Sequence, residues 1–262
     1  MYLIDSHCHL HDPEFFSTAA SEAALGRAAA AGVQQIICIG TDPEDSLTAQ
    51  RFSGQHPGVF WSFGVHPSEW QKWLTLSSSA KADFLSQAFS GSDSRPIAIG
   101  EVGLDYHYGN SDRAEQIRLF EEMIDIALRH QLPLIFHIRE AFDDFFTIIQ
   151  NFPTATGVIH SFTDNKKNLR RSLEHGFYIG VNGLATYSTL PTPPTERMLL
   201  ETDAPFLTPE PFRGTINESA YIKEIAAFIA TKLGVSRQEI AEQTTQNVHN
   251  LFQLPSTILC QP

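Results

Sequence analysis

The stretch Ile4-Asp5-Ser6-His7-Cys8-His9-Leu10 places two histidines just after an apolar run at residues 2–4. The apolar run predicts a short buried strand. Side chains two residues apart in an extended chain point to the same side, so His7 and His9 can converge on one point past the strand. Neutral imidazole is the commonest metal ligand, which makes this pair a candidate part of a metal site. A surface turn explains an isolated H-x-H equally well, so the interpretation depends on the rest of the chain.

Polar residues follow apolar runs throughout the chain. Further strands are predicted over residues 33–40, 59–65, 96–100, 132–136, 157–159, 177–181 and 197–200. The residues that follow these runs and the first one include His7, His9, His66, Glu101, His137, His160 and Asp203. A single such histidine is more often a cap or a core residue. A purely structural cluster of this many imidazoles and carboxylates would leave many polar groups to satisfy, whereas metal ions would satisfy them.

Strand and helix alternate along almost the whole chain. Helices are predicted over residues 21–31, 113–130 and 222–233, and the second of these is strongly amphipathic. About eight such units in 262 residues predict an α/β fold, a closed (β/α)8 TIM barrel that forms a single domain over residues 1–262. A doubly wound open sheet is the alternative, but no G-x-G-x-x-G follows a strand.

Three stretches are predicted to interrupt the regular pattern. Residues 77–79 and 91–94 are rich in serine and glycine and are predicted to be loop tips. The proline-rich stretch at residues 190–195 cannot be a helix interior. The connection between the seventh and eighth strands is therefore predicted to lack a full helix.

Composition and charge limit the possible functions. The formal net charge of −12 argues against a protein that coats nucleic acid with its whole surface, but allows a nucleic-acid enzyme whose positive charge comes from metal ions and a local patch. Cys8, Cys38 and Cys260 show no metal-type spacing and fit a reduced, cytoplasmic setting. No membrane span or signal peptide is expected. One barrel of this size needs no partner for its core, so we expect a monomer without a protein partner.

The polar residues at the strand ends suffice for two divalent metal ions, because active sites of barrels lie at these ends. They divide into two sets that share Glu101 as a bridge: His7, His9 and Asp203 for one ion, and His137 and His160 for the other. Mixed imidazole and carboxylate ligands favour zinc, manganese or another divalent ion over calcium, and magnesium is also a candidate. Two such ions can activate a water and stabilise a leaving oxygen at a phosphoryl group, a C–N bond or an ester.

Six motifs carry a family resemblance. In order they are DSHCHL (5–10), GVHP (64–67), IGEVGLDY (99–106), FHIREA (136–141), HSFT (160–163) and LETDAP (200–205). They resemble the TatD family of metal-dependent deoxyribonucleases, within the amidohydrolase-like superfamily, and they span nearly the whole chain. E-x-G-L-D-Y together with E-T-D-A-P is specific to this family, whereas H-x-H is shared more widely.

The resemblance implies a TIM-barrel hydrolase that acts on DNA, with the 3′-to-5′ exonuclease activity described for some members. It also implies that His7, His9, Glu101 and Asp203 hold one metal and that Glu101, His137 and His160 hold the other. The chain departs from the family pattern at three places: Asp164, where glycine is usual, the short proline-containing segment at 183–197, and Ser219 after Asn217-Glu218. The second departure borders the predicted pocket and bears on the range of substrates.

Each candidate site residue has a predicted role and an alternative. Glu101 is predicted to bridge the metals and to be catalytic, rather than to form a buried salt bridge. Asp203 is predicted to be both a ligand and the general base for the attacking water, rather than a ligand only. His66 and Arg139 are predicted to bind substrate phosphate or the leaving group. Their alternatives are a turn histidine and a structural ion pair with Glu140 or a neighbouring aspartate.

Two further groups are candidates for contact with nucleic acid. The basic run after the sixth strand is predicted to guide the DNA backbone, or else to be a solvated helix face: Lys166, Lys167, Arg170 and Arg171. Three phenylalanines after strands six and eight are candidates for stacking on bases, although most of the 19 phenylalanines must be core: Phe162, Phe206 and Phe212. Three histidines are not expected to be ligands: His11, His107 and His175.

The sequence therefore predicts a two-metal phosphodiesterase that acts on DNA, mainly on single strands or ends. The first alternative is an amidohydrolase-type enzyme that cleaves an amide, lactone or phosphoester bond in a small molecule, which the net negative charge favours. The second is a non-catalytic metal-binding protein. A missing ligand would indicate this last class, and here the ligand set is complete.

Overall fold

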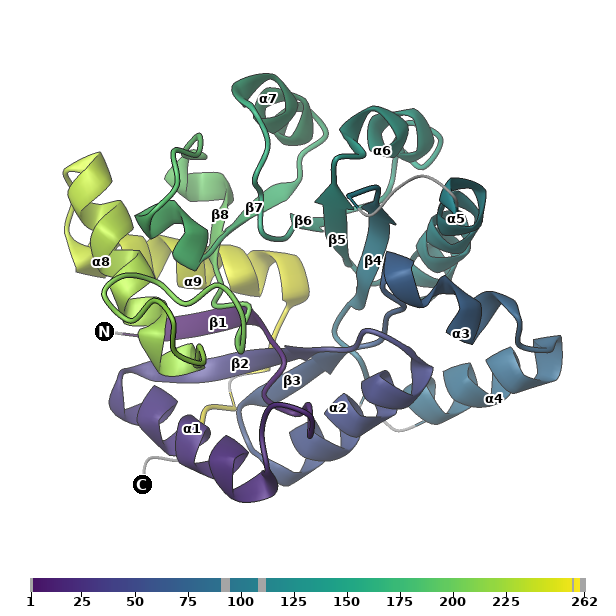
Figure 1. Cartoon of the computed structure of the whole chain (residues 1–262), viewed down its shortest axis with the longest axis horizontal. Helices are drawn as coiled ribbons and strands as arrows, with labels where there is room; N and C mark the ends of the chain where they lie inside the picture. Colours follow the sequence, from purple (N-terminus) through teal and green to yellow (C-terminus); the bar gives the residue numbers. More distant parts are fainter. Residues whose placement is uncertain (1, 91–94, 108–111, 256, 260–262) are drawn as a thin grey trace.

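A computed structural model shows a ring of parallel strands surrounded by helices (Figure 1). It describes residues 2–90, 95–107, 112–255 and 257–259. The strands within these residues are β1 (Leu3–Cys8), β2 (Val33–Ile39), β3 (Val59–Ser62), β4 (Ile99–Asp105), β5 (Leu134–Arg139), β6 (Gly157–Ile159), β7 (Tyr178–Val181) and β8 (Met198–Leu200). The predicted α/β barrel fold is confirmed.

The ring closes through two short contacts. Strands β1 to β3 form one parallel sheet and β4 to β8 form another, each in sequence order. Isolated parallel bridges join Phe63 to Ile99 and Cys8 to Ala204. The first bridge connects the end of β3 to β4, and the second connects β1 to the residues that follow β8, so the barrel has no free edge strand.

Helices lie between and around the strands. They are α1 (Thr18–Ala30), α2 (Pro43–Gln55), α3 (Trp70–Leu74), α4 (Ser78–Phe89), α5 (Arg113–His130), α6 (Phe142–Ile149), α7 (Lys166–Glu174), α8 (Ile222–Leu233) and α9 (Arg237–Phe252). The predicted helices at 113–130 and 222–233 match α5 and α8. None of the helices in the described part of the chain is long and apolar enough to cross a membrane.

The predicted loop at residues 77–79 is wrong. The Ser77 side chain accepts a hydrogen bond from the backbone N–H of Ala80 at 3.2 Å, and Ser78 begins α4. Serine is favoured at this N-cap position because its oxygen satisfies one of the unpaired N–H groups of the first turn. The predicted loop at 91–94 lies outside the described residues, as does Cys260.

The barrel has an inner and an outer apolar layer, because neighbouring residues of a strand face opposite sides. In β5, Leu134 and Phe136 pack in the outer layer beneath the helices, whereas Ile135 packs in the inner layer. The inner layer combines residues of several strands with the end of α9: Ile4, Ile37, Ile39, Ile135, Val158, Leu199, Val248, Leu251 and Phe252.

Helix α9 closes the end of the barrel at which the strands begin. Thr245 donates a hydrogen bond to the backbone carbonyl of Tyr2, just before β1, and Asn247 donates to the carbonyls of Thr195 and Met198, at the start of β8. Side chains of α9 thus fill the inner apolar layer at the end of the barrel where the strands begin. The helix predicted at 222–233 is followed by α9, which was not predicted from the sequence.

Three strands are longer than predicted, which changes the setting of the site. The strand predicted at residues 2–4 extends to Cys8 as β1 and includes His7. The predicted strand at 96–100 begins and ends too early, since β4 continues past Glu101 to Asp105. The predicted strand at 132–136 likewise extends through His137 to Arg139. Residues 102–105 of β4 pair in register with residues 136–139 of β5. Glu101 and His137 are therefore held within strands and not in loops.

The connection from β7 to β8 contains no α-helix, as predicted. Two short 3-10 turns, η2 (Gly183–Thr186) and η3 (Thr195–Arg197), flank the proline-rich segment. Three prolines within residues 191–194 explain this, because proline lacks the N–H that a helix interior needs.

Candidate metal centre

The predicted site residues gather at the end of the barrel opposite α9. His137 and His160 lie two residues after the inner-layer residues Ile135 and Val158, so they share the same inward face. His7 and His9 reach this centre from the end of β1 and face Asp203, which follows β8. The Nε2 atoms of the two histidines lie 3.5 and 3.6 Å from Oδ1 of Asp203. The predicted convergence of His7 and His9 is confirmed.

Glu101 lies between the two predicted ligand sets. Its Oε2 atom is 3.5 Å from Nε2 of His7. Its Oε1 atom is 2.7 Å from Nδ1 of His137 and 3.1 Å from Nε2 of His160. The carboxylate is buried, and its two oxygens face different groups of histidines.

The ligating atoms are close enough to hold divalent ions. Four groups of residues each place one such atom per residue within 4.8 Å of the others: His7 with His9 and Glu101, His7 with His160 and Asp203, Glu101 with His137 and His160, and His66 with Asp105 and His137. All six predicted ligands belong to these groups. Asp105 belongs as well and was not predicted from the sequence.

The outer nitrogens of two imidazoles have hydrogen-bond acceptors behind them, and a carboxylate lies behind the outer nitrogen of a third. Nδ1 of His9 lies 3.1 Å from the carbonyl of Ile39, and Nε2 of His137 lies 3.0 Å from Asp105 Oδ2. Nδ1 of His160 lies 3.4 Å from Glu201 Oε1. Imidazoles that bind metals usually have such a partner, which fixes the ring and leaves the other nitrogen unprotonated.

The surroundings of His7 also indicate whether these residues fit a metal ion. Its ring is fully buried, yet neither ring nitrogen has a hydrogen-bond partner among the described residues. A buried polar group without a partner is costly, and a divalent cation beside Nε2 would satisfy it. The residues present therefore fit a metal centre.

Charges within the centre also favour a cation. Burial opposes ionisation of Glu101, but His160, His137 and His7 outweigh it and hold the pKa of this carboxyl well below its usual range. Burial likewise opposes ionisation of Asp203, and the histidines around it lower its pKa. The pKa of His160 is raised well above normal, because Glu101 and Glu201 outweigh burial. The carboxylates thus favour positive charge within the centre. When no cation is bound, protons on histidines such as His160 supply that charge.

Asp105 and Glu201 are further functional candidates that were not predicted from the sequence. Glu101, Gly103 and Asp105 alternate along β4 and share one face. Glu201 follows the inner-layer residue Leu199 by two positions. The two-residue period was therefore the available signal for both carboxylates.

His66 and Arg139, the predicted substrate contacts, occupy different positions. The His66 ring centroid is 4.4 Å from that of His137, and its Nε2 is 4.0 Å from Glu101 Oε1, so His66 borders the centre. Its Nδ1 pairs with the hydroxyl of Ser68 at 2.8 Å. Arg139 is the last residue of β5 and lies beside Asp105 in the sheet. Its contact with substrate remains a prediction.

The three histidines not expected to be ligands each have another partner. His11 pairs with Asp45 at 3.0 Å, and His107 pairs with Glu140 at 2.6 Å. The His175 ring lies nearly parallel to that of Phe177, with 5.7 Å between centroids. None of the three belongs to the groups of ligating atoms found among the described residues.

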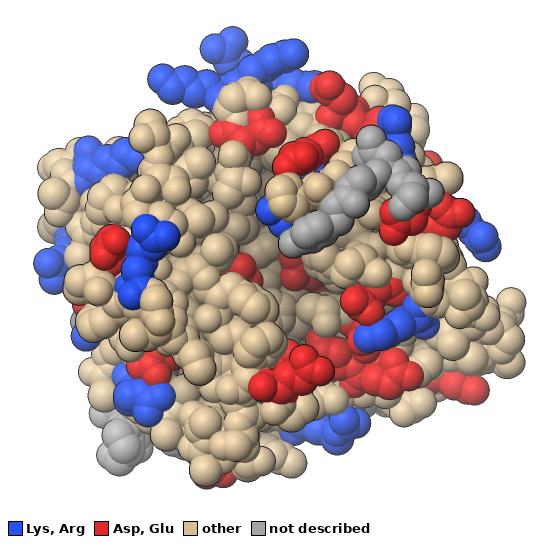
Figure 2. Space-filling view, in the orientation of Figure 1, with Lys and Arg blue, Asp and Glu red and all other residues tan. Residues whose placement is uncertain are grey.

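The nucleic-acid candidates are only partly available for binding. Lys166, Lys167 and Arg170 are exposed on α7, but Arg171 lies 3.9 Å over the Phe146 ring and 3.4 Å from Asp143. Figure 2 shows basic side chains gathered at the outer edge over α7, and acidic side chains in and around the recess in the middle of this face.

The three candidate stacking rings differ in exposure. The prediction is wrong for Phe162, which is buried and packs against Phe142. The Phe212 ring stacks on Tyr221 within the protein, with centroids 4.4 Å apart. Phe206 is exposed and lies beside the centre, with its centroid 6.3 Å from that of His9.

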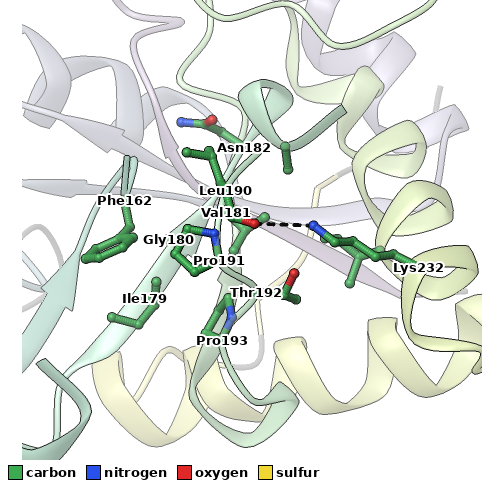
Figure 3. A pocket seen from close by; sticks show the side chains of 12 residues that line it. Phe162, Ile179, Gly180, Val181, Asn182, Leu190, Pro191, Thr192, Pro193 and Lys232 are labelled. Atoms are coloured by element: carbon green, nitrogen blue, oxygen red, sulfur yellow. Dashed lines mark hydrogen bonds between the residues drawn. The ribbon is translucent and has the colours of Figure 1, made fainter. Parts of the chain in front are cut away.

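A small, largely apolar cavity lies at the flank where a helix after β7 is missing. Figure 3 shows it between β7, the segment Leu190 to Pro193 and α8, with Lys232 Nζ donating to the Leu190 carbonyl at 3.4 Å. Asn182 lines this cavity and also donates to Ser161 Oγ at 2.8 Å, close to His160. The reshaped flank therefore touches the edge of the centre.

Comparison with known proteins places the chain in a family. A family model described as "TatD related DNase" matches residues 4–253. The chain belongs to the TatD-related DNase family. A Bacillus subtilis relative named "Uncharacterized metal-dependent hydrolase YabD" is 31% identical, over 96% of this chain and 99% of its own. A Salmonella typhimurium relative named "3'-5' ssDNA/RNA exonuclease TatD" is 32% identical, over 88% of this chain and 92% of its own.

A solved structure agrees with this placement. The TatD homologue YjjV from Escherichia coli has a TM-score of 0.84 and 29% sequence identity, over 97% of this chain and 98% of that one. The TatD family and its relatives identify this protein as a metal-dependent hydrolase that acts on ester bonds.

Proposed function

We propose that this TatD-family protein hydrolyses phosphodiester bonds of DNA, as a 3′-to-5′ exonuclease on single strands or ends, with two divalent ions of zinc, magnesium or manganese. The observation that carries the proposal is the position of Glu101. One oxygen faces His7 at 3.5 Å, and the other faces His137 and His160 at 2.7 and 3.1 Å. A carboxylate placed between two sets of imidazoles is suited to bridge two ions.

Some residues of the centre would hold the metal ions, and Asp203 would also take part in the reaction. His7, His9, Glu101 and Asp203 would hold one ion, and Glu101, His137 and His160 the other. When bound, the ions polarise the phosphoryl group and make water a better nucleophile at neutral pH. Asp203 accepts the proton of the attacking water at a carboxylate oxygen, since histidines hold its pKa low and keep it ionised.

His66 and Arg139 would orient the phosphate. His66 Nε2 is directed towards the centre, 4.0 Å from Glu101 Oε1, while Nδ1 is engaged by Ser68. Arg139 can offer paired N–H donors to phosphate oxygens from the end of β5.

The acidic rim of the recess in Figure 2 favours a second candidate. Carboxylates around the opening repel a polyanion unless metal ions and basic side chains compensate. An amidohydrolase-type enzyme acting on a small amide, lactone or phosphoester would not face this repulsion.

One experiment separates the two candidates. An end-labelled single-stranded DNA oligonucleotide is incubated with magnesium, manganese or zinc, or with a chelator, for the wild type, Glu101→Ala and the exposed control Glu242→Ala. We expect metal-dependent shortening from the 3′ end by the wild type and the control, and none by Glu101→Ala. A folded wild type that binds two ions but cleaves no DNA, yet hydrolyses a member of an amide, lactone and phosphotriester panel, would favour the second candidate.

A further inference from the structure

Two exposed aromatic rings form a pair beside the metal centre. Phe15 and Phe206 are 42% and 46% exposed, and their ring centroids lie 5.3 Å apart. The Phe206 centroid is 6.3 Å from that of His9. The other large hydrophobic side chains that are clearly exposed in the described part of the chain are aliphatic: Ile216, Leu233, Val235 and Ile258. Among the described residues, clearly exposed phenylalanine, tyrosine and tryptophan rings are thus confined to the edge of the candidate site.

The backbone holds this pair in place. Phe206 follows Asp203 by three residues, and its N–H donates to the Asp203 carbonyl at 2.8 Å. Its own carbonyl accepts a hydrogen bond from the side chain of Asn217 at 2.6 Å. Phe15 precedes the buried Phe16, whose N–H donates to the Asp12 carbonyl at 2.9 Å. The exposed rings therefore sit on anchored turns.

The geometry of the pair leaves aromatic surface open. The two ring planes meet at 78°, so the contact between them cannot cover a face of both rings. An exposed apolar face costs free energy in water, and packing against the partner ring alone does not remove that cost. The open surface lies beside His9, whose ring centroid is 6.3 Å from that of Phe206.

We propose that Phe206, supported edge to face by Phe15, stacks on a nucleobase of the strand whose phosphodiester lies at the metal centre. The inference rests on the proposed function and names how the same site holds its substrate. Every base has a π-face, so stacking tolerates any sequence but requires a base that is free of its duplex neighbours. The pair therefore favours unpaired nucleotides.

A double-mutant cycle between the ring and the base tests the proposal. Fluorescently labelled tetrathymidylate with cleavage-resistant phosphorothioate linkages is compared with a tetramer of the same backbone that carries tetrahydrofuran in place of every nucleoside. Dissociation constants are measured by anisotropy at low salt, with metal present, for wild type, Phe206→Leu, Phe206→Tyr and the distant exposed control Leu233→Ala. We expect the wild type and Leu233→Ala to bind tetrathymidylate about 5- to 100-fold more tightly than the base-free tetramer.

The variants decide between stacking and a general effect. Phe206→Leu should lose most of the preference for bases, and Phe206→Tyr should retain it. Equal weakening of both oligomers by Phe206→Leu, an unchanged preference, or no binding of either oligomer by the wild type would overturn the proposal. Cleavage of unmodified tetrathymidylate is recorded with the same proteins and metal. A base preference that depends on Phe206 without cleavage would retain stacking and reject the nuclease, and cleavage without such a preference would do the reverse.

Discussion

The carboxylate of Glu201 stands behind His160, with Oε1 3.4 Å from Nδ1, while Nε2 of the same ring points to Glu101 at 3.1 Å. Glu201 is itself fixed by the backbone N–H of Ser161, which donates to Oε1 at 2.6 Å. The carboxylate therefore sets which nitrogen of His160 carries a proton and which is free to bind a metal ion.

Replacing Glu201 by Gln should weaken metal binding without removing a ligand. The amide oxygen can still accept from Ser161, but the loss of charge makes His160 a poorer base. We expect the affinity for one divalent ion to fall about 10- to 100-fold. Calorimetric titration with manganese measures this, with Glu242→Gln as the exposed control. Wild-type affinity in Glu201→Gln would show that the pair is structural only.

Replacing Asp203 by Asn tests the assignment of the general base. Asparagine keeps an oxygen that faces His7 and His9 but cannot accept the proton of water. We expect kcat on DNA to fall about 10²- to 10⁴-fold, with a much smaller change in KM. Steady-state kinetics together with metal analysis are required. A fall in activity that more metal restores would assign Asp203 as a ligand only.

Removing metal should destabilise the protein, because the ions bind only the assembled centre. With free metal at 100 times its Kd, a bound ion stabilises the fold by about 3 kcal/mol. For a chain of this size the Tm should rise by roughly 5–10 °C on addition of metal. Calorimetric scans with manganese and with chelator measure this shift, and Glu101→Ala should abolish it. A shift of the same size in that variant would place the binding elsewhere.

Three basic residues of α7 should contribute to the salt dependence of DNA binding. Replacing Lys166, Lys167 and Arg170 together by Gln should reduce the slope of log K against log salt by up to about 2 for single-stranded DNA. Arg171→Gln is the matched control, since its guanidinium already contacts Phe146 and Asp143. An unchanged slope in the triple variant would assign these residues to a solvated surface.

The pair of Asp45 with His11 should make stability depend on pH. Burial opposes ionisation of Asp45, but His11 and the N–H of Thr41 outweigh it and lower its pKa to about 2. A depressed pKa adds stability above the unfolded value, near pH 4, and this stability is lost as the pH falls towards 2. Asp45→Asn should therefore cost about 2 kcal/mol at pH 7 and pH 5, and less below pH 4.

Urea unfolding at these pH values measures the difference, with the exposed Asp83→Asn as control. The difference between wild type and Asp45→Asn must shrink as the solution is acidified. A difference that stays constant from pH 7 to pH 3 would show that Asp45 acts through packing and not through its charge.

The barrel and most of its centre could be predicted because both follow from local alternation. Ile135 and Val158 are each followed two residues later by a site histidine, and each pair lies within or next to one strand. The extent of β4 could not be predicted from its apolar run, since Glu101 and Asp105 continue the strand as polar residues. Pairing with β5, some 30 residues away in the sequence, holds Asp105 in the strand, whereas Glu101 lies at a register shift of that pairing and its N–H donates to the carbonyl of Gly40.

Contacts between distant residues were the other limit. Glu201 and His160 directly follow different strands, β8 and β6, and meet only because the barrel curves, which no local pattern records. The capping box that joins Ser236 and Glu239 marks the start of α9 and was available in the sequence. The helix itself was hard to predict, because α9 has few apolar residues on its buried face before Val248. The contact of Arg171 with Phe146 likewise depends on how α7 packs against α6.

Because α9 covers the end of the barrel opposite the centre, a substrate reaches the centre from the end at which the strands finish. A long polymeric substrate therefore cannot pass through the barrel from one end to the other. In the proposed reaction on DNA, each nucleic-acid strand would present its end or a bend at this opening, and each released fragment would leave past the rest of the strand. The proposed exonuclease would therefore release the strand, at least partly, between successive cleavage steps.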